Sequence, residues 1–163
     1  MKQADAIPFK ILSSPQVAMR AKQWRVNDKK IVFTNGVFDI LHAGHIASLS
    51  QAAKEADYLV VGLNADQSVK RLKGNSRPVN PQDARALVIA SLLIVDAVVI
   101  FEEDTPLELI KLIMPDVIVK GGDYTIDQIV GAKEVMAAGG RVVINPILNG
   151  FSTTGLIDQI RKG

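Results

Sequence analysis

The chain lacks cysteine, has only two histidines, and draws just 5% of its 163 residues from the aromatic types. Without cysteine it cannot form disulfides, use a thiol nucleophile or bind zinc through thiolates. Its 19 Lys and Arg residues nearly balance its 17 Asp and Glu residues, which leaves a net charge of +2. Nucleic-acid-binding proteins carry a clustered basic excess instead, so we expect no nucleic-acid partner.

Long hydrophobic runs are also missing. The most apolar segment, Ala86–Phe101, is interrupted by Ser91 and Asp96 and is too short to span a bilayer. The polar start of the chain, Met1–Asp5, shows no secretory signal pattern. Hydrophobic residues still make up 48% of the chain, which is enough to bury a core. We therefore expect a soluble, cytoplasmic protein without membrane contacts.

Five short runs rich in valine and isoleucine predict buried strands, because they do not alternate polar and apolar residues. The segments between them repeat apolar residues every three or four positions, which predicts helices. This alternation predicts right-handed βαβ units, and so an α/β, Rossmann-like three-layer fold with a five-stranded parallel sheet and helices on both faces. The strand order that we expect is 3-2-1-4-5. The expected strands are Ile31–Thr34, Tyr58–Leu63, Val95–Phe101, Val117–Val119 and Arg141–Ile144.

Cap and turn residues mark the expected helix ends. Ser14-Pro15 opens a helix that runs to about Val26, and a last short helix is expected over Ser152–Arg161. The irregular stretch Leu72–Asn80 predicts a loop near a ligand site. The length predicts one domain, with residues 1–29 as an N-terminal helical extension and residues 30–163 as the catalytic core. Further helices are expected to start at Pro81, Pro106 and Thr125.

Three polar stretches rich in glycine or hydroxyl groups follow the first, fourth and fifth predicted strands. They are TNGVFDILHAGH at 34–45, KGGD at 120–123 and FSTT at 151–154. Ligands bind at the carboxyl ends of parallel strands, near the point where strand order reverses, so the three stretches should converge. His42 and His45 would lie on one side of a helix start, whose free N–H groups suit phosphate. Two imidazoles there predict phosphoryl or nucleotidyl transfer without a protein nucleophile, usually with Mg²⁺.

Simpler interpretations of these residues stay open at this point. The two histidines could bind zinc together with a carboxylate, or lie on the surface of a helix start. KGGD could be only a tight turn, Ser152 only a helix N-cap, and Arg85 only a salt-bridged helix residue. Asp39 could cap the turn before the histidines or approach a metal. The sequence has no P-loop, GxGxxG, GxSxG or HExxH motif, so those classes of site are excluded.

The frame GVFDILHAGH at 36–45 resembles the signature of the HxGH nucleotidyltransferases, the cytidylyltransferase-like superfamily. Further segments resemble the adenylyltransferase half of the bifunctional heptose kinase/adenylyltransferases, in a stand-alone form. They are VVGLNADQSVKRLKG, RPVNPQDARA, FEEDTPLELI, PDVIVKGGDYT and FSTTGLI. The resemblance implies transfer of AMP from ATP to a heptose 1-phosphate, with Mg²⁺ accompanying ATP and pyrophosphate released. HxGH enzymes often self-associate, so it also allows a homodimer.

The resemblance implies a role for each candidate site residue. His42, His45 and Lys120 would be catalytic, acting on the phosphates of ATP. Lys73 and Arg85 would contact the sugar phosphate, and Asp39 would help to place the metal. The nucleotide would be bound by Thr34, Asn35, Gly36, Phe38, Asp39, Gly44, Gly121, Asp123, Ser152, Thr153 and Thr154.

Other functions fit part of the pattern. A glycerol-3-phosphate or other alcohol-phosphate cytidylyltransferase shares the HxGH frame, but its arginine-rich run before the final Ser-Thr-Thr is missing here. A non-catalytic, nucleotide-binding regulatory domain could share the fold, although all three motifs are intact. A phospho-acceptor module would need an acidic cluster after the first strand, where residues 34–36 (TNG) have no acidic side chain.

Overall fold

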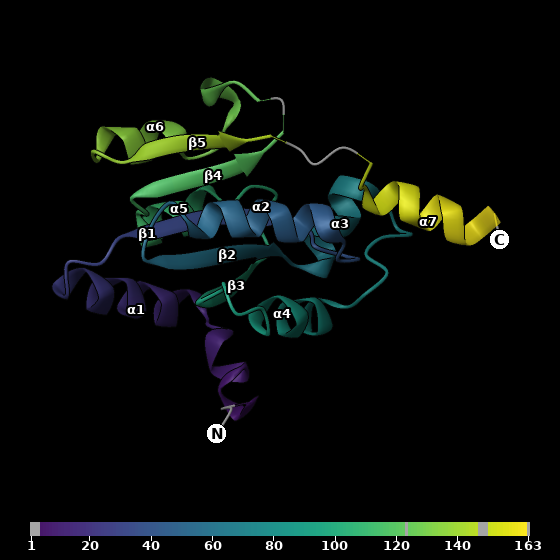
Figure 1. Ribbon diagram of the computed structural model, residues 1–163, viewed down its shortest axis with the longest axis horizontal. Coiled ribbons are helices and arrows are strands. Elements are labelled where there is room, and N and C mark those ends of the chain that lie inside the picture. The colour runs from purple at the N-terminus through teal and green to yellow at the C-terminus, as the bar shows by residue number, and fades with distance from the viewer. Residues whose placement is uncertain (1–3, 123, 147–149, 163) are drawn as a thin grey trace.

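A computed structural model describes residues 4–122, 124–146 and 150–162 (Figure 1). Its centre is a single parallel sheet with the strand order β3-β2-β1-β4-β5, which confirms the predicted architecture. The order reverses between β1 and β4, because the chain moves outward through β2 and β3 before it returns to the other side of β1. The strands are β1 (Ile31–Gly36), β2 (Tyr58–Asn64), β3 (Ala97–Phe101), β4 (Val117–Gly121) and β5 (Arg141–Asn145).

Helices cover both faces of the sheet, as predicted. Buried side chains of α1, α5 and α6 pack with one set of strand residues, and those of α2 and α4 pack with the other set. Side chains alternate between the faces along each strand, so Phe33 lies in the first core and Val32 in the second. The helices are α1 (Ser14–Val26), α2 (Ala43–Ala53), α3 (Asp66–Lys73), α4 (Gln82–Ala90), α5 (Leu107–Ile113), α6 (Ala132–Ala137) and α7 (Thr153–Lys162).

The first long helix, α1, has the predicted bounds and packs on the core. A capping box between Ser13 and Gln16 satisfies its first turn. Val17 and Ala21 are fully buried, and the Trp24 ring stacks on Tyr58 with the ring centroids 4.3 Å apart. In the structure, α1 shares its core with the strands. The division of the chain into residues 1–29 and 30–163 stays a prediction.

Local details differ from the sequence-based expectation, and four of the five strands end one or two residues later than predicted. The helix α3 was not predicted, because its sequence DQSVKRLK has no apolar period and buries only Ser68 and Val69. The turn after Thr125 is a short 3₁₀ helix, Ile126–Gln128. Strand β3 begins two residues later than expected, because the Asp96 carboxylate accepts a hydrogen bond from the Leu59 N–H at 2.7 Å.

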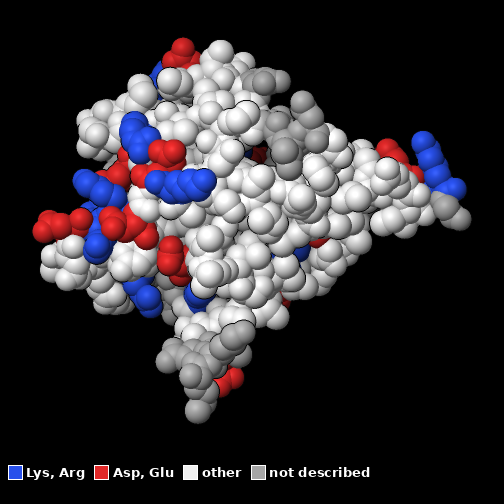
Figure 2. All heavy atoms as spheres, viewed as in Figure 1, with Lys and Arg blue, Asp and Glu red and all other residues white. Residues whose placement is uncertain are grey.

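The end of the sheet where the strands begin carries many charged side chains. Figure 2 shows charged side chains of both signs gathered on the side where the strands begin. Opposite charges pair at this edge, so it offers little net attraction to phosphate. The pairs are Lys29–Asp57, Lys30–Asp116 and Arg141–Glu55.

The carboxyl ends of the strands point to the opposite edge, where α3 lies and α7 begins (Figure 1). Helix α7 extends away from the body of the molecule at this edge, and none of its described side chains is fully buried. No helix within residues 4–122, 124–146 and 150–162 is long and apolar enough to cross a membrane.

Candidate active site

The histidine pair lies where the loop after β1 turns into α2. His42 is the N-cap residue of α2, with an extended backbone, and His45 lies in the first helical turn. The two rings stack with their centroids 3.8 Å apart and an interplanar angle of 22°. The Phe38 ring meets the His45 ring edge-on at 5.3 Å. The predicted placement of both imidazoles on one side of a helix start is therefore what the structure shows.

Burial keeps the histidine pair uncharged. Burial, together with the neighbouring His42, lowers the pKa of His45 to about 4. Burial also lowers the pKa of His42. Among the described residues, the Nδ1 atoms of both rings are buried without a hydrogen-bond partner. Unsatisfied buried nitrogens destabilise a folded protein, so this arrangement is typical of a site whose ligand supplies the missing interactions.

A cavity of about 310 Å³ joins α2, the end of β4 and the start of α7. Gly44 leaves the space open, because a Cβ there would lie 3.0 Å from His42 Nδ1 and 3.1 Å from Phe151 Cβ. The Phe151 ring lies nearly parallel to that of His42, with centroids 6.2 Å apart. All three predicted stretches thus meet around one cavity, lined by His42, Gly44, His45, Ser48, Gly121, Pro146, Phe151, Ser152 and Thr153. Thr154 does not line it.

A second cavity, of about 210 Å³, lies on the other face of the sheet. Successive residues of a strand point to opposite faces, so Lys120 lines this cavity and Gly121 lines the first. The Lys120 Nζ donates to Asn35 Oδ1 at 3.2 Å and lies 6.0 Å from the centre of the Tyr124 ring. Burial lowers the pKa of the Lys120 ammonium. The remaining lining residues are Ile118, Gln128, Ile129 and Val130.

The other predicted nucleotide-binding residues shape the loop after β1. Thr34 is buried within β1, and Gly36 lies under the Phe38 ring, where a Cβ would be only 2.9 Å from a ring carbon. Phe38 contacts His45 and lines neither of the two cavities described so far. Asp123 lies outside the described residues.

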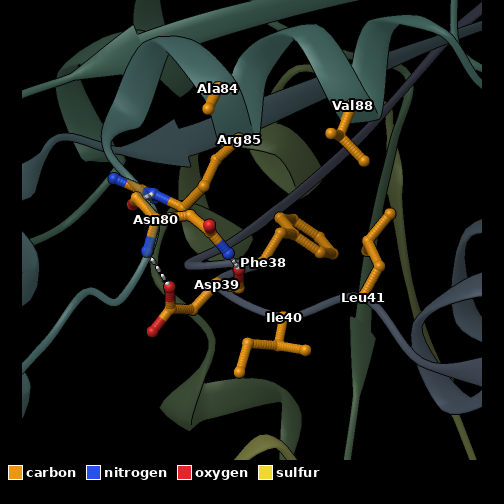
Figure 3. Close-up of a pocket in the computed structure, with 8 residues that line it drawn as sticks. All are labelled: Phe38, Asp39, Ile40, Leu41, Asn80, Ala84, Arg85 and Val88. Atoms are coloured by element: carbon orange, nitrogen blue, oxygen red, sulfur yellow. Dashed lines mark hydrogen bonds between the residues drawn. The ribbon is translucent and has the colours of Figure 1, made fainter.

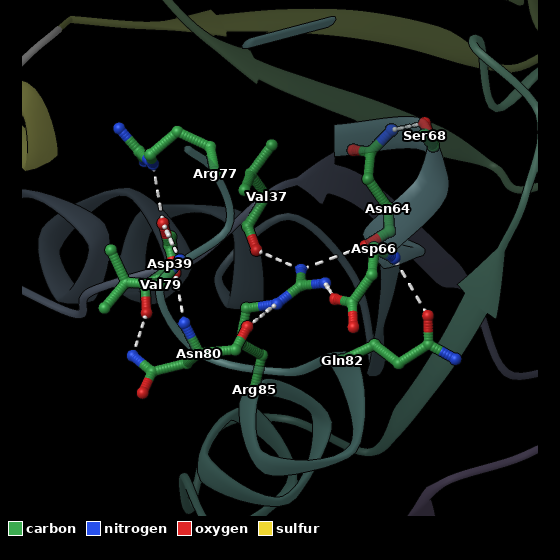
Figure 4. A network of polar contacts seen from close by, with 10 residues as sticks. All are labelled: Val37, Asp39, Asn64, Asp66, Ser68, Arg77, Val79, Asn80, Gln82 and Arg85. Atoms are coloured by element: carbon green, nitrogen blue, oxygen red, sulfur yellow. Dashed lines mark hydrogen bonds and ion pairs between the residues drawn. The ribbon is translucent and has the colours of Figure 1, made fainter. Parts of the chain in front are cut away.

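The structure corrects the expectation that Asp39 places a metal. Its side chain has no exposed surface, and its carboxylate accepts hydrogen bonds from Arg77 Nε at 2.7 Å and from two main-chain N–H groups. These N–H groups belong to Val79, at 2.8 Å, and Asn80, at 2.9 Å (Figure 4). A carboxylate bonded in this way has no face left for a cation. The described residues also hold no group of three His, Asp or Glu side chains placed to bind a metal ion.

The two predicted sugar-phosphate ligands lie apart from both cavities. The Arg85 side chain is only 1% exposed, and its guanidinium donates to Asn80 O at 2.9 Å and Val37 O at 2.7 Å. It also donates to Asn64 O at 2.9 Å and to Asp66 Oδ1 at 2.7 Å (Figure 4). These bonds use the guanidinium inside the protein, so direct contact with a substrate is not available to it. Lys73 is exposed at the end of α3 and lines neither cavity.

A parallel sheet that places a histidine pair, a glycine and hydroxyl groups around one cavity defines a nucleotidyltransferase class of fold and site. The chain belongs to the cytidylyltransferase-like family, which matches residues 33–159. Among curated proteins it is 53% identical over 162 residues to the bifunctional protein HldE of Acidiphilium cryptum, covering 99% of this chain and 33% of the relative. It is 54% identical over 153 residues to HldE of Mesorhizobium japonicum, covering 94% and 31%. The chain thus spans about a third of the length of these relatives.

Solved structures agree with this assignment. A lipopolysaccharide core biosynthesis protein from Thermoplasma volcanium is 31% identical, with a TM-score of 0.59 over 74% of this chain and 97% of that one. A pantoate-beta-alanine ligase from Francisella tularensis is 16% identical, also with a TM-score of 0.59, over 94% and 78%. The second likeness shows the fold alone.

The histidine pair gives a first testable prediction. ATP binding should raise the pKa of His45 above its low value of about 4, because negative phosphate oxygens favour the imidazolium form. The chain has only two histidines, so their ring-proton NMR signals can be titrated without crowding. Adenosine, which lacks phosphate, is the control and should leave the pKa unchanged. Equal histidine pKa values with and without ATP would show that the pair does not lie at the phosphate site.

Proposed function

We propose that the chain is a heptose 1-phosphate adenylyltransferase, which transfers AMP from ATP to the sugar phosphate and releases pyrophosphate. The observation that carries the proposal is the stacked pair His42 and His45 on the same cavity as Ser152 and Thr153, beside the point where strand order reverses. The relationship to HldE proteins and the likeness to a lipopolysaccharide core biosynthesis protein support it. The choice of a heptose as the sugar is supported by the segments SVKRLKG, RPVNP and KGGDYT, which resemble those of heptose adenylyltransferases.

The chemistry needs no nucleophile from the protein. An oxygen of the sugar 1-phosphate attacks the α-phosphorus of ATP, and a new phosphorus–oxygen bond forms. The bond from that phosphorus to the bridging oxygen of the β-phosphate breaks, and its electron pair leaves with pyrophosphate. Neutral imidazoles of His42 and His45 donate hydrogen bonds to the oxygens on which charge develops. The start of α7, with Ser152 and Thr153, holds the distal phosphates through hydroxyl and N–H groups.

Mg²⁺ belongs to the ATP substrate in this proposal. The triphosphate oxygens are its ligands, and Asp39 takes no part because its carboxylate is fully bonded inside the protein. When bound, Mg²⁺ neutralises charge on the phosphates.

The second cavity is the proposed place for the sugar. Its lining mixes hydrogen-bonding side chains, Asn35 and Gln128, with the amphipathic ring of Tyr124, which suits a polyol with both polar and apolar faces. Lys120 stands on the strand between the two cavities and attracts the phosphate that the sugar carries. This location replaces the expected contact with Arg85, whose guanidinium is bonded internally.

The proposal extends to the setting of the enzyme. Since ATP is a cytoplasmic substrate, we propose a cytoplasmic location, with no membrane or nucleic-acid partner. A homodimer stays a prediction from the resemblance.

A matrix of nucleotides and phosphorylated acceptors tests the proposal. The purified protein is incubated with Mg²⁺, with ATP or CTP, and with heptose 1-phosphate, heptose 7-phosphate or glycerol 3-phosphate, while pyrophosphate is measured. We expect release only with ATP and heptose 1-phosphate. Release with CTP and an alcohol phosphate would instead support the cytidylyltransferase, and nucleotide binding without any turnover would support the regulatory domain.

A further inference from the structure

The segment just before the histidine helix, residues 37–39, is held at both ends by polar side chains from elsewhere in the chain. At one end, Arg85 donates to the carbonyl oxygen of Val37. At the other end, Asp39 is bonded through its carboxylate to Arg77 and to two main-chain N–H groups, and the Asn80 side chain donates to the Asp39 carbonyl at 2.6 Å. Figure 4 shows these contacts as one connected network around the loop after α3.

Phe38 lies between the two held ends, in a backbone conformation that a residue with a Cβ rarely adopts. Its φ is +47°, in the left-handed region. In this conformation its ring covers Gly36 and meets the His45 ring edge-on. Because the conformation is unfavourable by itself, the bonds on either side must hold it.

The Phe38 ring packs against the second hydrophobic core on part of its surface only. A cavity of about 180 Å³ lies beside it, lined by apolar side chains of the same loop and of α4 (Figure 3). If the segment relaxed to an ordinary backbone conformation, the ring would have space to move away from His45. The apolar lining residues are Phe38, Ile40, Leu41, Ala84 and Val88.

We infer that Arg77, Asp39 and Arg85 are positioning residues for the histidine pair, acting through Phe38. None of the three lines the phosphate cavity, so none is a catalytic residue. They fix the main-chain conformation of residues 37–39. This conformation determines the position of the Phe38 ring, and the ring determines the position of His45. The kinetic consequence rests on the proposed function, whereas the effect on the position of His45 does not.

The variant Arg77→Ala tests the inference, because Arg77 belongs to neither hydrophobic core and its side chain, at 15% exposed, is the least buried of the three. We expect kcat to fall about tenfold with a smaller change in the KM for ATP, because a small displacement of a catalytic group costs rate. The NMR signals of the His45 ring protons should also shift, because the neighbouring Phe38 ring moves. Arg77→Lys keeps a cation beside Asp39 and should restore both readouts in part.

Arg71→Ala is the matched control. Arg71 is also an arginine paired with an aspartate, Asp104, and its other hydrogen bond goes to the Glu102 carbonyl oxygen, outside the network. It should leave kcat and the His45 signals as in the wild type. If Arg77→Ala does not fold, Asn80→Ala takes its place, since it removes one bond to Asp39 from an exposed residue.

Two outcomes would overturn the inference. In both, Arg77→Ala leaves the His45 signals and kcat as in the wild type. If thermal stability is also unchanged, the network has no role; if thermal stability falls, the network is purely structural. The NMR measurement needs no substrate. Failure of the proposed function, seen as no turnover by the wild type, is therefore distinguishable from failure of the inference.

Discussion

Replacement of His45 by alanine should lower kcat with ATP and heptose 1-phosphate by about 100-fold or more, the usual cost of losing one donor to a developing oxyanion. The imidazole is fixed before the substrate arrives, by its stacking on His42 and its edge contact with Phe38. It therefore needs no reorganisation in the transition state. The KM for ATP should change less than kcat, because the donor contributes most when charge develops at the α-phosphorus.

Steady-state pyrophosphate release over a range of ATP concentrations measures both parameters. Ile46→Ala is the matched control, because Ile46 is the next residue of α2, is 38% exposed and does not line the cavity. Its turnover should be close to that of the wild type. A His45→Ala enzyme with unchanged turnover would show that the imidazole does not stabilise the transition state.

The sequence was sufficient to predict those parts of the molecule that depend on local pattern. The parallel sheet followed from the alternation of strands and helices, and the strand order 3-2-1-4-5 was expected because it would bring the three polar stretches together. The pair His42 and His45 stood out because a glycine lies between them and a strand comes before them. Gly44 could be recognised as a position of close approach, although the atoms it approaches, in His42 and Phe151, required the structure.

Residues whose role depends on long-range contacts could not be assigned in this way. Arg85 and Asp39 carry charges that a sequence associates with substrate or metal, yet both are buried and bonded to main-chain groups of distant segments. Arg77 and Asn80 lie in the loop that the sequence predicted to be near a ligand site, but nothing in their local sequence indicates that they bond to Asp39. One sign was available for Arg85: an arginine within an otherwise apolar helix must find internal partners when that helix packs on a sheet.

Replacement of Lys120 by methionine should lower the activity and raise the thermal stability. We expect turnover to fall about 100-fold, because the replacement removes the only Lys or Arg among the described lining residues of the two cavities, where the proposed function brings two anionic substrates together. We also expect a higher Tm at pH 7, because burial penalises the ammonium, as its lowered pKa shows, and methionine fills similar space without a charge.

The pH dependence of stability follows from the direction of this pKa change. The folded state holds the proton of Lys120 less tightly than the unfolded state, so the cost of the buried charge is fully present below the folded pKa. That cost disappears as the pH rises through the folded pKa towards the ordinary value of 10.5. The Tm difference between Lys120→Met and the wild type should therefore narrow in alkaline buffer.

Thermal unfolding at several pH values, together with turnover at pH 7, measures both effects of the Lys120 replacement. Lys111→Met is the control, since Lys111 is exposed on α5 and pairs only with Glu108. It should change neither turnover nor Tm by much, because exposed ion pairs contribute little. A lower Tm for Lys120→Met, accompanied by lost turnover, would indicate that Lys120 supports the fold through Asn35. A higher Tm with lost turnover would indicate that Lys120 acts on the phosphates of the substrates. Its buried charge lowers the stability of the free protein, and only the binding of anionic substrates offsets this loss.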